Sequence, residues 1–497
     1  MRSYLKRLVT AGAAYQAGDI LSKGAALVTL PLYTRYVVTT QYGYAEALLT
    51  AVILISIVLR LGVGEAFIRY YYDDRDPERR DRIAAGAVGL VFATTTVAAL
   101  IGVAFAAPLS RLLLSSHHSQ TGLLEIAMLG VWAFTNLEIA YALLRADERK
   151  GSYMKASIAD VSLTIPLMVY LVVFRHDQAR GLLAGNYIAS SLILLGLWWS
   201  ERHRLLRGMR RRTGAPPFDF RRMLHFGLPT VPADASVYAL QVADRWYLLR
   251  DYSSAAAGVY AIAAKLATVV FVGVRGFQYA WPPLAYSVED DAVAGRLYAL
   301  VTTYYVLATG VVVAGVALFA RWGVRVLDHS YWSSYTAIPW LALGWALYGL
   351  YLIFIVISGR AQRTRRNLPA ALAGLAVNIG CLFLLVPALG IAGAGIALAV
   401  AYAAMVIVIY LLTRGLFSVG FEWLRLAKLL AVFVAVAVGG ELALPSHGVA
   451  GFLLRGVAWS LIFPALWLCN FFSEAERRRV VAIGSTLRRG RRASPEG

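Results

Sequence analysis

Two apolar segments are the most informative about the fold: FGLPTVPADASVYALQVADRWYLL (226–249) and, after a short polar break, GVYAIAAKLATVVFVGVR (258–275). Each segment is long and apolar enough to cross the ~30 Å hydrocarbon layer of a bilayer. Each also carries charges within it, among them Asp234, Lys265 and Arg275. A charge at the centre of a membrane helix costs about 2.5–3.5 kcal/mol on insertion scales. We therefore expect these side chains to face an interior cavity rather than lipid.

The composition extends this interpretation to the whole chain. Hydrophobic residues make up 59% of the 497 residues, compared with about 45–50% in soluble domains. The apolar residues form about 14 runs of spanning length. We predict an all-α integral membrane protein, located in the cell membrane with many passes.

The net charge of +20 is explained by topology rather than by nucleic acid. Lysine and arginine gather in every second connection between apolar runs, for example in 201–222 and 474–497. Cytoplasmic connections of membrane proteins carry this excess of positive charge. Both termini are therefore predicted to be cytoplasmic, and no nucleic-acid partner is expected.

An internal repeat predicts two pseudo-symmetric lobes. A shift of 215 residues places Gly43 under Gly258 and Arg60 under Arg275. Six helices separate the copies, so both copies have the same orientation, and the binding site is expected between the lobes near the bilayer midplane. The predicted parts are an N-lobe of six helices (1–200), a basic linker (201–222), a C-lobe of six helices (223–413), two further helices (414–472) and a basic tail (473–497).

Cations within the membrane suggest an anionic substrate. Arg60 and Arg275 are expected to face each other across one cavity, with Lys265 and Lys23 beside them. Guanidinium groups bind phosphate bidentately and a lysine adds a point charge, so a phosphate or diphosphate is the expected ligand. An alternative stays open, in which local carboxylates neutralise these cations, as Asp19 would neutralise Lys23.

Further polar residues accompany these cations. Asp19, Glu65 and Asp234 are candidates for binding Na⁺ or a proton that couples transport to an ion gradient, although Glu65 could instead pair with Arg60. Tyr238 and Gln241 are secondary candidates for the cavity. Arg35 and Arg245 lie nearer the helix ends, where long cationic side chains reach the membrane surface. Asp244 is expected to neutralise Arg245, and no metal or organic cofactor is expected.

Several motifs resemble the polysaccharide-biosynthesis flippases of the Wzx type, in the multidrug/oligosaccharidyl-lipid/polysaccharide exporter superfamily. They are GDILSK (18–23), LPLYTRY (30–36), FGLP (226–229) and GVY (258–260). The resemblance implies a central cavity with cations on the second and eighth helices, where Arg60 and Arg275 stand. It also implies that the two C-terminal helices form a groove for a lipid tail.

The expected function is a flippase working by alternating access, not an enzyme. Its expected substrate is an oligosaccharide linked to undecaprenyl diphosphate, moved to the outer leaflet for surface polysaccharide synthesis, with other assembly proteins as possible partners. One alternative is a cation-coupled multidrug exporter of the same fold, whose cavity should be acidic or apolar. A second is a membrane glycan polymerase or ligase, which would need a large outer loop for its catalytic residues.

Overall fold

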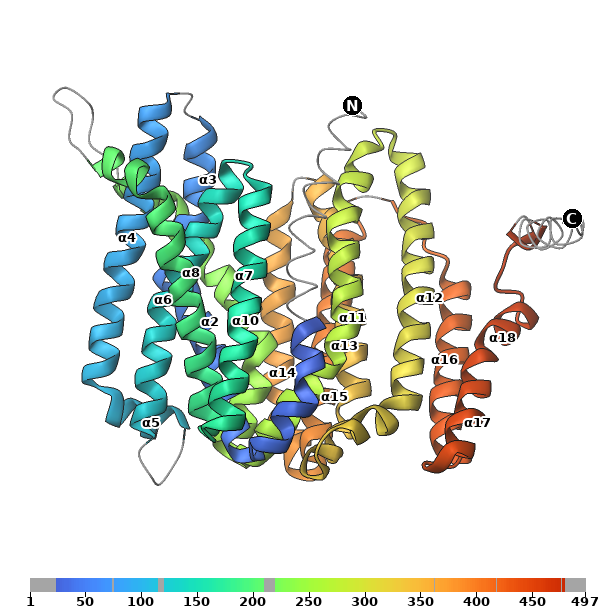
Figure 1. Cartoon of the computed structure of the whole chain (residues 1–497). Helices are drawn as coiled ribbons and strands as arrows, with labels where there is room; N and C mark the ends of the chain where they lie inside the picture. The colour runs from blue at the N-terminus through green and yellow to red at the C-terminus, as the bar shows by residue number, and fades with distance from the viewer. Residues whose placement is uncertain are drawn as a thin grey trace, which may run out of the picture.

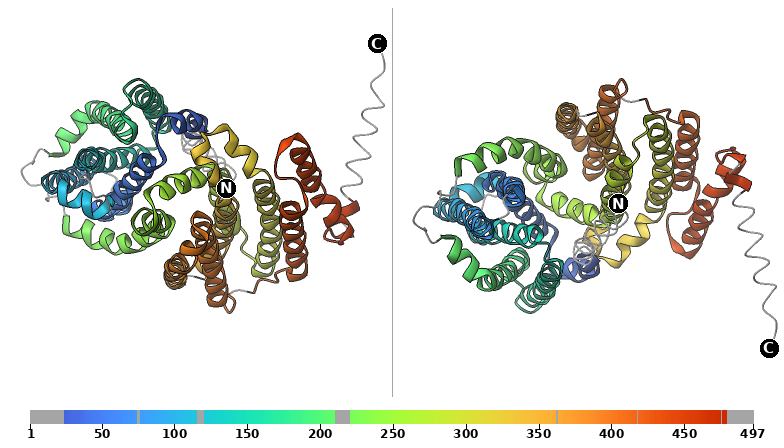
Figure 2. Two further views of the ribbon diagram at one scale, coloured as in Figure 1. Left: turned by 90° about the horizontal axis from the view of Figure 1, so that it is seen from below. Right: turned by 90° about the horizontal axis from the view of Figure 1, so that it is seen from above.

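The computed structural model describes residues 24–73, 76–114, 120–209, 220–361, 363–416, 418–474 and 476–478. Within these ranges the secondary structure is helical, with no β-strand. Two helix bundles stand side by side, and the C-terminal helices lie outside the second bundle (Figure 1). The arrangement is seen most clearly along the helix axes (Figure 2).

The first bundle is the N-lobe. It starts with helical residues 24–36, which precede Val37 and Val38. The elements that follow are α2 (Thr39–Leu59), α3 (Val63–Asp73), α4 (Pro77–Ala104), α5 (Ala106–Leu114), α6 (Thr121–Ala146), α7 (Lys150–Val169), η1 (Tyr170–Phe174) and α8 (Gln178–Met209).

The second bundle is the C-lobe, and a C-terminal hairpin packs against it. The C-lobe elements are α9 (Phe220–Gly227), η2 (Leu228–Thr230), α10 (Val231–Tyr247), η3 (Leu248–Tyr252), α11 (Ser254–Ser287), α12 (Asp291–Gly323), η4 (Val324–Val326), η5 (His329–Thr336), α13 (Ile338–Arg360), η6 (Thr364–Arg366), α14 (Asn367–Leu389) and α15 (Ile391–Thr413). The hairpin consists of α16 (Trp423–Ala443), α17 (Gly448–Ser460) and α18 (Ile462–Leu468), and Phe433 and Ile462 share an apolar cluster with Leu307 of α12.

Twelve of the described helices are long and apolar enough to span a membrane. The seventh apolar run of the sequence is interrupted instead, as α9, η2 and α10, with Pro229 and Pro232 at the interruption. Proline lacks the amide hydrogen that a continuous helix needs, which accounts for the break. The first run is described only from residue 24 onward. A total of 14 spans and the cytoplasmic termini stay predictions.

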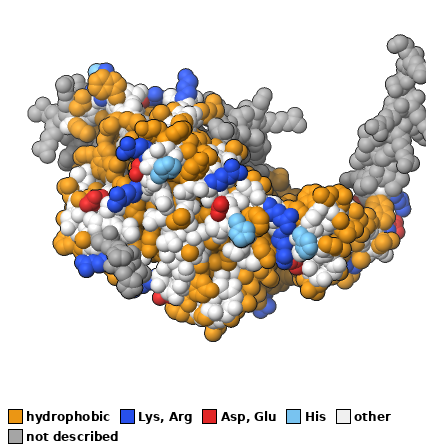
Figure 3. Space-filling model, turned by 60° about the horizontal axis from the view of Figure 1, so that its bottom comes forward, with side chains coloured by type: hydrophobic (Ala, Val, Ile, Leu, Met, Phe, Trp, Pro, Cys, Tyr) orange, Lys and Arg blue, Asp and Glu red, His pale blue; other side chains and the backbone are white. Residues whose placement is uncertain are grey.

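The surface matches a chain immersed in lipid. Side chains such as Leu384, Leu442 and Val449 are mostly exposed on the outside of the bundles. In Figure 3, hydrophobic side chains cover large areas, and the charged and histidine side chains form small separate groups. Apolar exposure on this scale is unusual in soluble monomers and is what hydrocarbon contact requires.

The helix bounds follow the 215-residue repeat. α2 begins at Thr39 and α11 at Ser254, a difference of 215 residues. The starts of α6 and α13, at Thr121 and Ile338, differ by 217. The two lobes therefore repeat one helix order, as expected from the sequence.

The repeated helices α2 and α11 touch at equivalent glycines. A Cβ on Gly43 would lie 3.0 Å from the amide nitrogen of Gly258, and a Cβ on Gly258 would lie 3.0 Å from that of Gly43. Each added carbon would also collide with the carbonyl oxygen of the other helix's first residue, Ser254 or Thr39. The repeat therefore maps each side of this contact onto the other side, as expected for residues close to a pseudo-two-fold axis. We call this end of the molecule the outer end, because the arginine distribution predicts it to face away from the cytoplasm.

Two boundaries differ from those expected. α2 ends at Leu59, because Leu61 (φ 51°) and Gly62 (φ 67°) both take the left-handed conformation, whereas α11 continues unbroken past the equivalent position. Arg60 therefore caps α2 rather than lying within a long helix. α8 also runs to Met209, well past the residue at which a linker was expected to start.

The extension of α8 is held by a charged cluster. Arg204 donates to Asp81 of α4 at 2.7 Å and to Asp147 at 2.6 Å, and to the hydroxyl of Tyr71 of α3 at 2.7 Å. Hydrogen bonds between ionised partners are stronger than neutral ones. The first part of the expected linker is therefore a structural part of the N-lobe.

Candidate functional site

A cavity of about 210 Å³ lies where the two lobes meet. Its walls come from residues 24–36, from α2, α7 and α8 of the N-lobe, and from α11 of the C-lobe. The polar residues that line it are Thr29, Tyr33, Tyr42, Glu46, Asp160, Thr164, Asn186 and Lys265. The rest of the lining is apolar, so the cavity offers a few polar groups within a hydrophobic wall, as is typical of ligand sites.

An ion cluster joins the two lobes at this cavity. Glu46 of α2 pairs with the ammonium group of Lys265 on α11, and its second oxygen lies 3.6 Å from Nη1 of Arg245 on α10. Lys265 also donates to the hydroxyl of Tyr42 at 2.6 Å. The Glu46 side chain is 8% exposed and that of Lys265 34% exposed. The lysine therefore keeps a free face toward the cavity while its counter-ion is buried.

The N-lobe side of the cavity adds a second carboxylate. Asp160 of α7 accepts a hydrogen bond from Ser190 of α8 at 3.5 Å. Asn186, one turn before Ser190 on α8, lines the same space. Among the described residues, the lining thus contains one cation, Lys265, and two carboxylates, Glu46 and Asp160.

Arg60 and Arg275 each have partners in their own lobe. Nη1 of Arg60 lies 3.8 Å from Glu138 of α6. Nη1 of Arg275 donates to Gln278 at 3.1 Å, and its guanidinium lies 4.9 Å from the centre of the Phe271 ring. Neither arginine belongs to the lining of the inter-lobe cavity. The expectation that they face each other across one substrate cavity stays a prediction.

Arg245 differs from one expectation, and Asp244 agrees with another. Arg245 does not extend to the membrane surface, because its guanidinium reaches Glu46 at the lobe interface. Asp244 is 1% exposed, and its carboxylate accepts hydrogen bonds from the hydroxyl of Tyr260 and the backbone amide of Arg245. Asp244 still interacts electrostatically with Arg245, as expected from the sequence, and Arg245 has Glu46 as a second carboxylate partner.

The other candidates are spread over several elements. Arg35 is exposed near the end of the helix 24–36, in agreement with a position at the membrane surface. Tyr238 and Gln241 are half-buried on α10, and Asp234 is exposed in its first turn. Asp19, Lys23 and the side chain of Glu65 lie outside the described residues.

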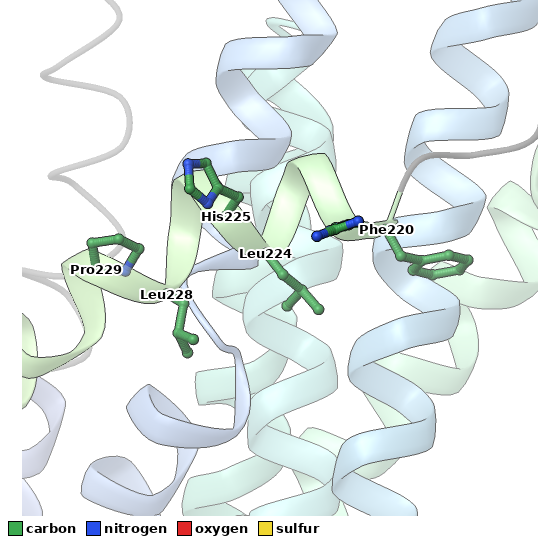
Figure 4. Close-up of a pocket in the computed structure, with 6 residues that line it drawn as sticks. Phe220, Leu224, His225, Leu228 and Pro229 are labelled. Carbon is green, nitrogen blue, oxygen red and sulfur yellow. The ribbon is translucent and has the colours of Figure 1, made fainter.

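A second hollow lies along α9 and η2, at the start of the C-lobe. It is lined by Phe220, Arg221, Leu224, His225, Leu228 and Pro229, all from α9 and η2. Leu224 and Leu228 point to one side of the chain and His225 to the other (Figure 4). Its lining comes from one continuous segment, unlike that of the inter-lobe cavity.

Glu46 lies on the polar face of the second apolar run, but the sequence did not indicate it as a site residue. The signal was present, because a lone carboxylate inside an apolar run is rare and needs a partner. Lys265 had no carboxylate within one turn of its own helix. What no pattern supplied was the pairing of these two residues, which are 219 positions apart.

Comparisons with known proteins agree with this architecture. A lipid II flippase MurJ in an inward closed conformation superposes with a TM-score of 0.70 at 13% identity, covering 90% of this chain and 96% of that one. An inward-facing multidrug resistance MATE family transporter of the MOP superfamily gives a TM-score of 0.62 at 15% identity, covering 84% of this chain and 96% of the other. At these identities the likeness shows a shared fold.

Sequence comparison identifies the family. A curated relative, Lsg locus putative protein 1 of Haemophilus influenzae, is 24% identical over 279 residues, which are 55% of this chain and 64% of the relative. The match thus spans somewhat less than two thirds of that relative's length. The model of the family described as "Polysaccharide biosynthesis protein" matches residues 9–284, more than half of the chain. The chain therefore belongs to the polysaccharide biosynthesis protein family and has the fold of the MOP superfamily transporters.

Proposed function

We propose that this protein carries a polyprenyl-diphosphate-linked oligosaccharide from the cytoplasmic to the outer leaflet by alternating access. The observation that carries the proposal is the inter-lobe cavity with Lys265 exposed at its wall. A lysine in a low-dielectric space attracts a diphosphate strongly. Thr29, Thr164 and Asn186 supply donors and acceptors for sugar hydroxyls. Family membership supports the same role.

The size of the cavity supports a moving carrier. About 210 Å³ is below the roughly 300–1,000 Å³ of ordinary ligand sites. An oligosaccharide therefore enters only after the lobes separate, and rigid-body rocking of two repeats about a central site achieves this separation. The lipid tail would remain in the bilayer, beside the hairpin of α16–α18.

The membrane potential favours this direction of transport. Moving one charge across the membrane changes its energy by about 2.3 kcal/mol per 100 mV. A diphosphate carrying two negative charges is therefore driven outward by an inside-negative potential. Coupling to Na⁺ or H⁺ through Asp19, Glu65 or Asp234 would add to this drive or reset the empty carrier.

Reconstituted vesicles test the proposal. A fluorescent lipid-linked oligosaccharide placed in one leaflet should become accessible to a membrane-impermeant quencher only in vesicles that contain the protein. Lys265→Met, Arg60→Ala and Arg275→Ala should each lower the rate by about tenfold or more, because a hydrogen bond to a charged group contributes roughly 1.5–3 kcal/mol. Arg111→Ala, at an exposed arginine of α5, serves as the control. Equal rates with and without protein would refute the proposed transport.

One observation favours a second candidate, export of organic cations. Asp160 places a carboxylate at the cavity wall, where a cationic drug would find a counter-charge. In a drug-sensitive host, the protein should then lower accumulation of a fluorescent cationic dye, and Asp160→Asn should abolish that effect. Unchanged dye accumulation would leave the lipid-linked glycan as the remaining cargo.

A further inference from the structure

The ion cluster of Glu46, Lys265 and Arg245 can form only when the two lobes are in contact. Its carboxylate, Glu46, belongs to the N-lobe, and both of its cations, Lys265 and Arg245, belong to the C-lobe. The glycine contact between Gly43 and Gly258 lies closer to the outer end, about one turn before Glu46 on α2 and about two turns before Lys265 on α11. The ion pairs therefore persist only while α2 and α11 stay together at that end.

Other contacts close the same end. The hydroxyl of Tyr331 in η5 donates to the carbonyl of Val37 at 2.6 Å, and the ring of Tyr331 packs edge-on against Tyr42. Tyr42 in turn accepts the hydrogen bond from Lys265. The cluster is thus connected directly to the layer of residues that seals the outer end.

Separation of the lobes would leave Glu46 with no cation. A buried carboxylate that loses its partner is strongly unfavourable, so an empty carrier resists opening at the outer end. When an anion binds Lys265, it breaks the pair with Glu46 while the lobes are still together, and the binding energy of the anion offsets that cost. Opening of the loaded carrier then does not break this pair a second time. Lys265 is open to the cavity for such an exchange.

We propose that Glu46 is a built-in counter-ion that keeps the empty carrier closed at the outer end, and that the diphosphate of the cargo displaces it from Lys265. The outer end then opens only when the site is loaded. This inference rests on the proposed function for the identity of the anion. It assigns to Glu46 a positioning role and predicts that the cargo competes with an internal carboxylate.

A buried cysteine at the outer end reports the opening. Val37 is 2% exposed, so a Val37→Cys chain, with Cys381 and Cys469 replaced by Ala, should react slowly with an impermeant maleimide. Glu46→Gln in this background should raise the labelling rate on the order of tenfold, since loss of the pair shifts a two-state equilibrium toward the open form. Lys265→Gln should do the same. The variant with both substitutions should label no faster than the faster single variant, because the two substitutions remove the same ion pair.

Glu138→Gln is the matched control for labelling. Glu138 also pairs with an arginine, but that arginine, Arg60, belongs to the same lobe. Its removal should leave the labelling rate unchanged. A rate in Glu46→Gln equal to that of the parent, or an equal rise in Glu138→Gln, would overturn the assignment.

A soluble anion tests the exchange itself. Inorganic pyrophosphate added to the purified Val37→Cys chain should raise its labelling rate, whereas sodium chloride at the same ionic strength should not. In Glu46→Gln, pyrophosphate should add nothing further. Absence of a pyrophosphate effect in the parent would refute the exchange. If both labelling results hold while lipid-linked glycan is not moved, the counter-ion role stands and the proposed cargo fails.

Discussion

At the scale of single residues, the described intramembrane charges are fixed by specific partners. Arg455 of α17 shows this most fully. It is 0% exposed, pairs with Glu441 at 2.7 Å, and donates to the backbone carbonyls of Leu318 and Pro445, each at 3.2 Å. Arg455 therefore ties the C-terminal hairpin to α12. The role of a buried arginine therefore follows from its hydrogen-bond partners rather than from its charge alone.

Arg455 gives a stability prediction. Arg455→Met should destabilise the folded protein by about 1–3 kcal/mol, because it leaves the carbonyls of Leu318 and Pro445 without their donor, whereas Glu441 keeps its pair with Arg321. Thermal unfolding in detergent measures the change. Arg478→Ala, at an exposed pair with Glu474, should shift the unfolding free energy by at most about 0.5 kcal/mol. Equal losses in the two variants would contradict a special role for Arg455.

At the scale of elements, one residue separates two membrane helices. α14 ends at Leu389 and α15 begins at Ile391, and Gly390 between them has φ 55° and ψ −134°. A side chain is strained in that backbone conformation. The glycine therefore allows the chain to reverse direction in the shortest possible connection, which secures the count of two helices in this region.

Gly390 is the basis of an element-scale prediction. Gly390→Ala should lower the unfolding free energy by about 1–3 kcal/mol. Gly380 lies inside α14 with open space around it. Gly380→Ala should instead raise the unfolding free energy by roughly 0.5–1 kcal/mol, since alanine favours the helical conformation. Detergent unfolding curves distinguish the two signs. A stabilising Gly390→Ala would disprove the strained connection.

At the scale of the whole molecule, the two lobes meet at a symmetric point. Gly43 and Gly258 are equivalent under the 215-residue repeat and contact each other. A side chain at either position pushes the same two helices apart. A substitution at Gly43 should therefore disturb the contact between the lobes as much as the equivalent substitution at Gly258.

This symmetry predicts equal effects from changes in different lobes. Gly43→Val and Gly258→Val should each raise maleimide labelling of Val37→Cys to a similar extent, because each added side chain meets a backbone carbonyl of the opposite helix. Gly273→Val, on α11 with open space around it, should label like the parent. A large effect from one glycine alone would argue against an axis at this contact.

The membrane class, the helix order and the repeat follow from the order of the amino acids alone. Apolar runs must match the thickness of a bilayer, and this length is visible in one dimension. Lys265 could be placed at the cavity because a charge inside such a run needs a polar surrounding. Arg60 was misplaced within its helix, because the break that ends α2 depends on two left-handed residues rather than on hydrophobicity.

The pairing of the charges, by contrast, depends on how the helices pack. Glu46 and Lys265 belong to different lobes, and their pairing depends on how α2 and α11 pack. Arg245 reaches across the lobes to Glu46, while its neighbour Asp244 bonds to Tyr260. Hydrophobic length is a property of each segment alone, whereas an ion pair is a property of two segments and their relative placement. For that reason the sequence predicted the two lobes, and the folded chain showed the cluster that joins them.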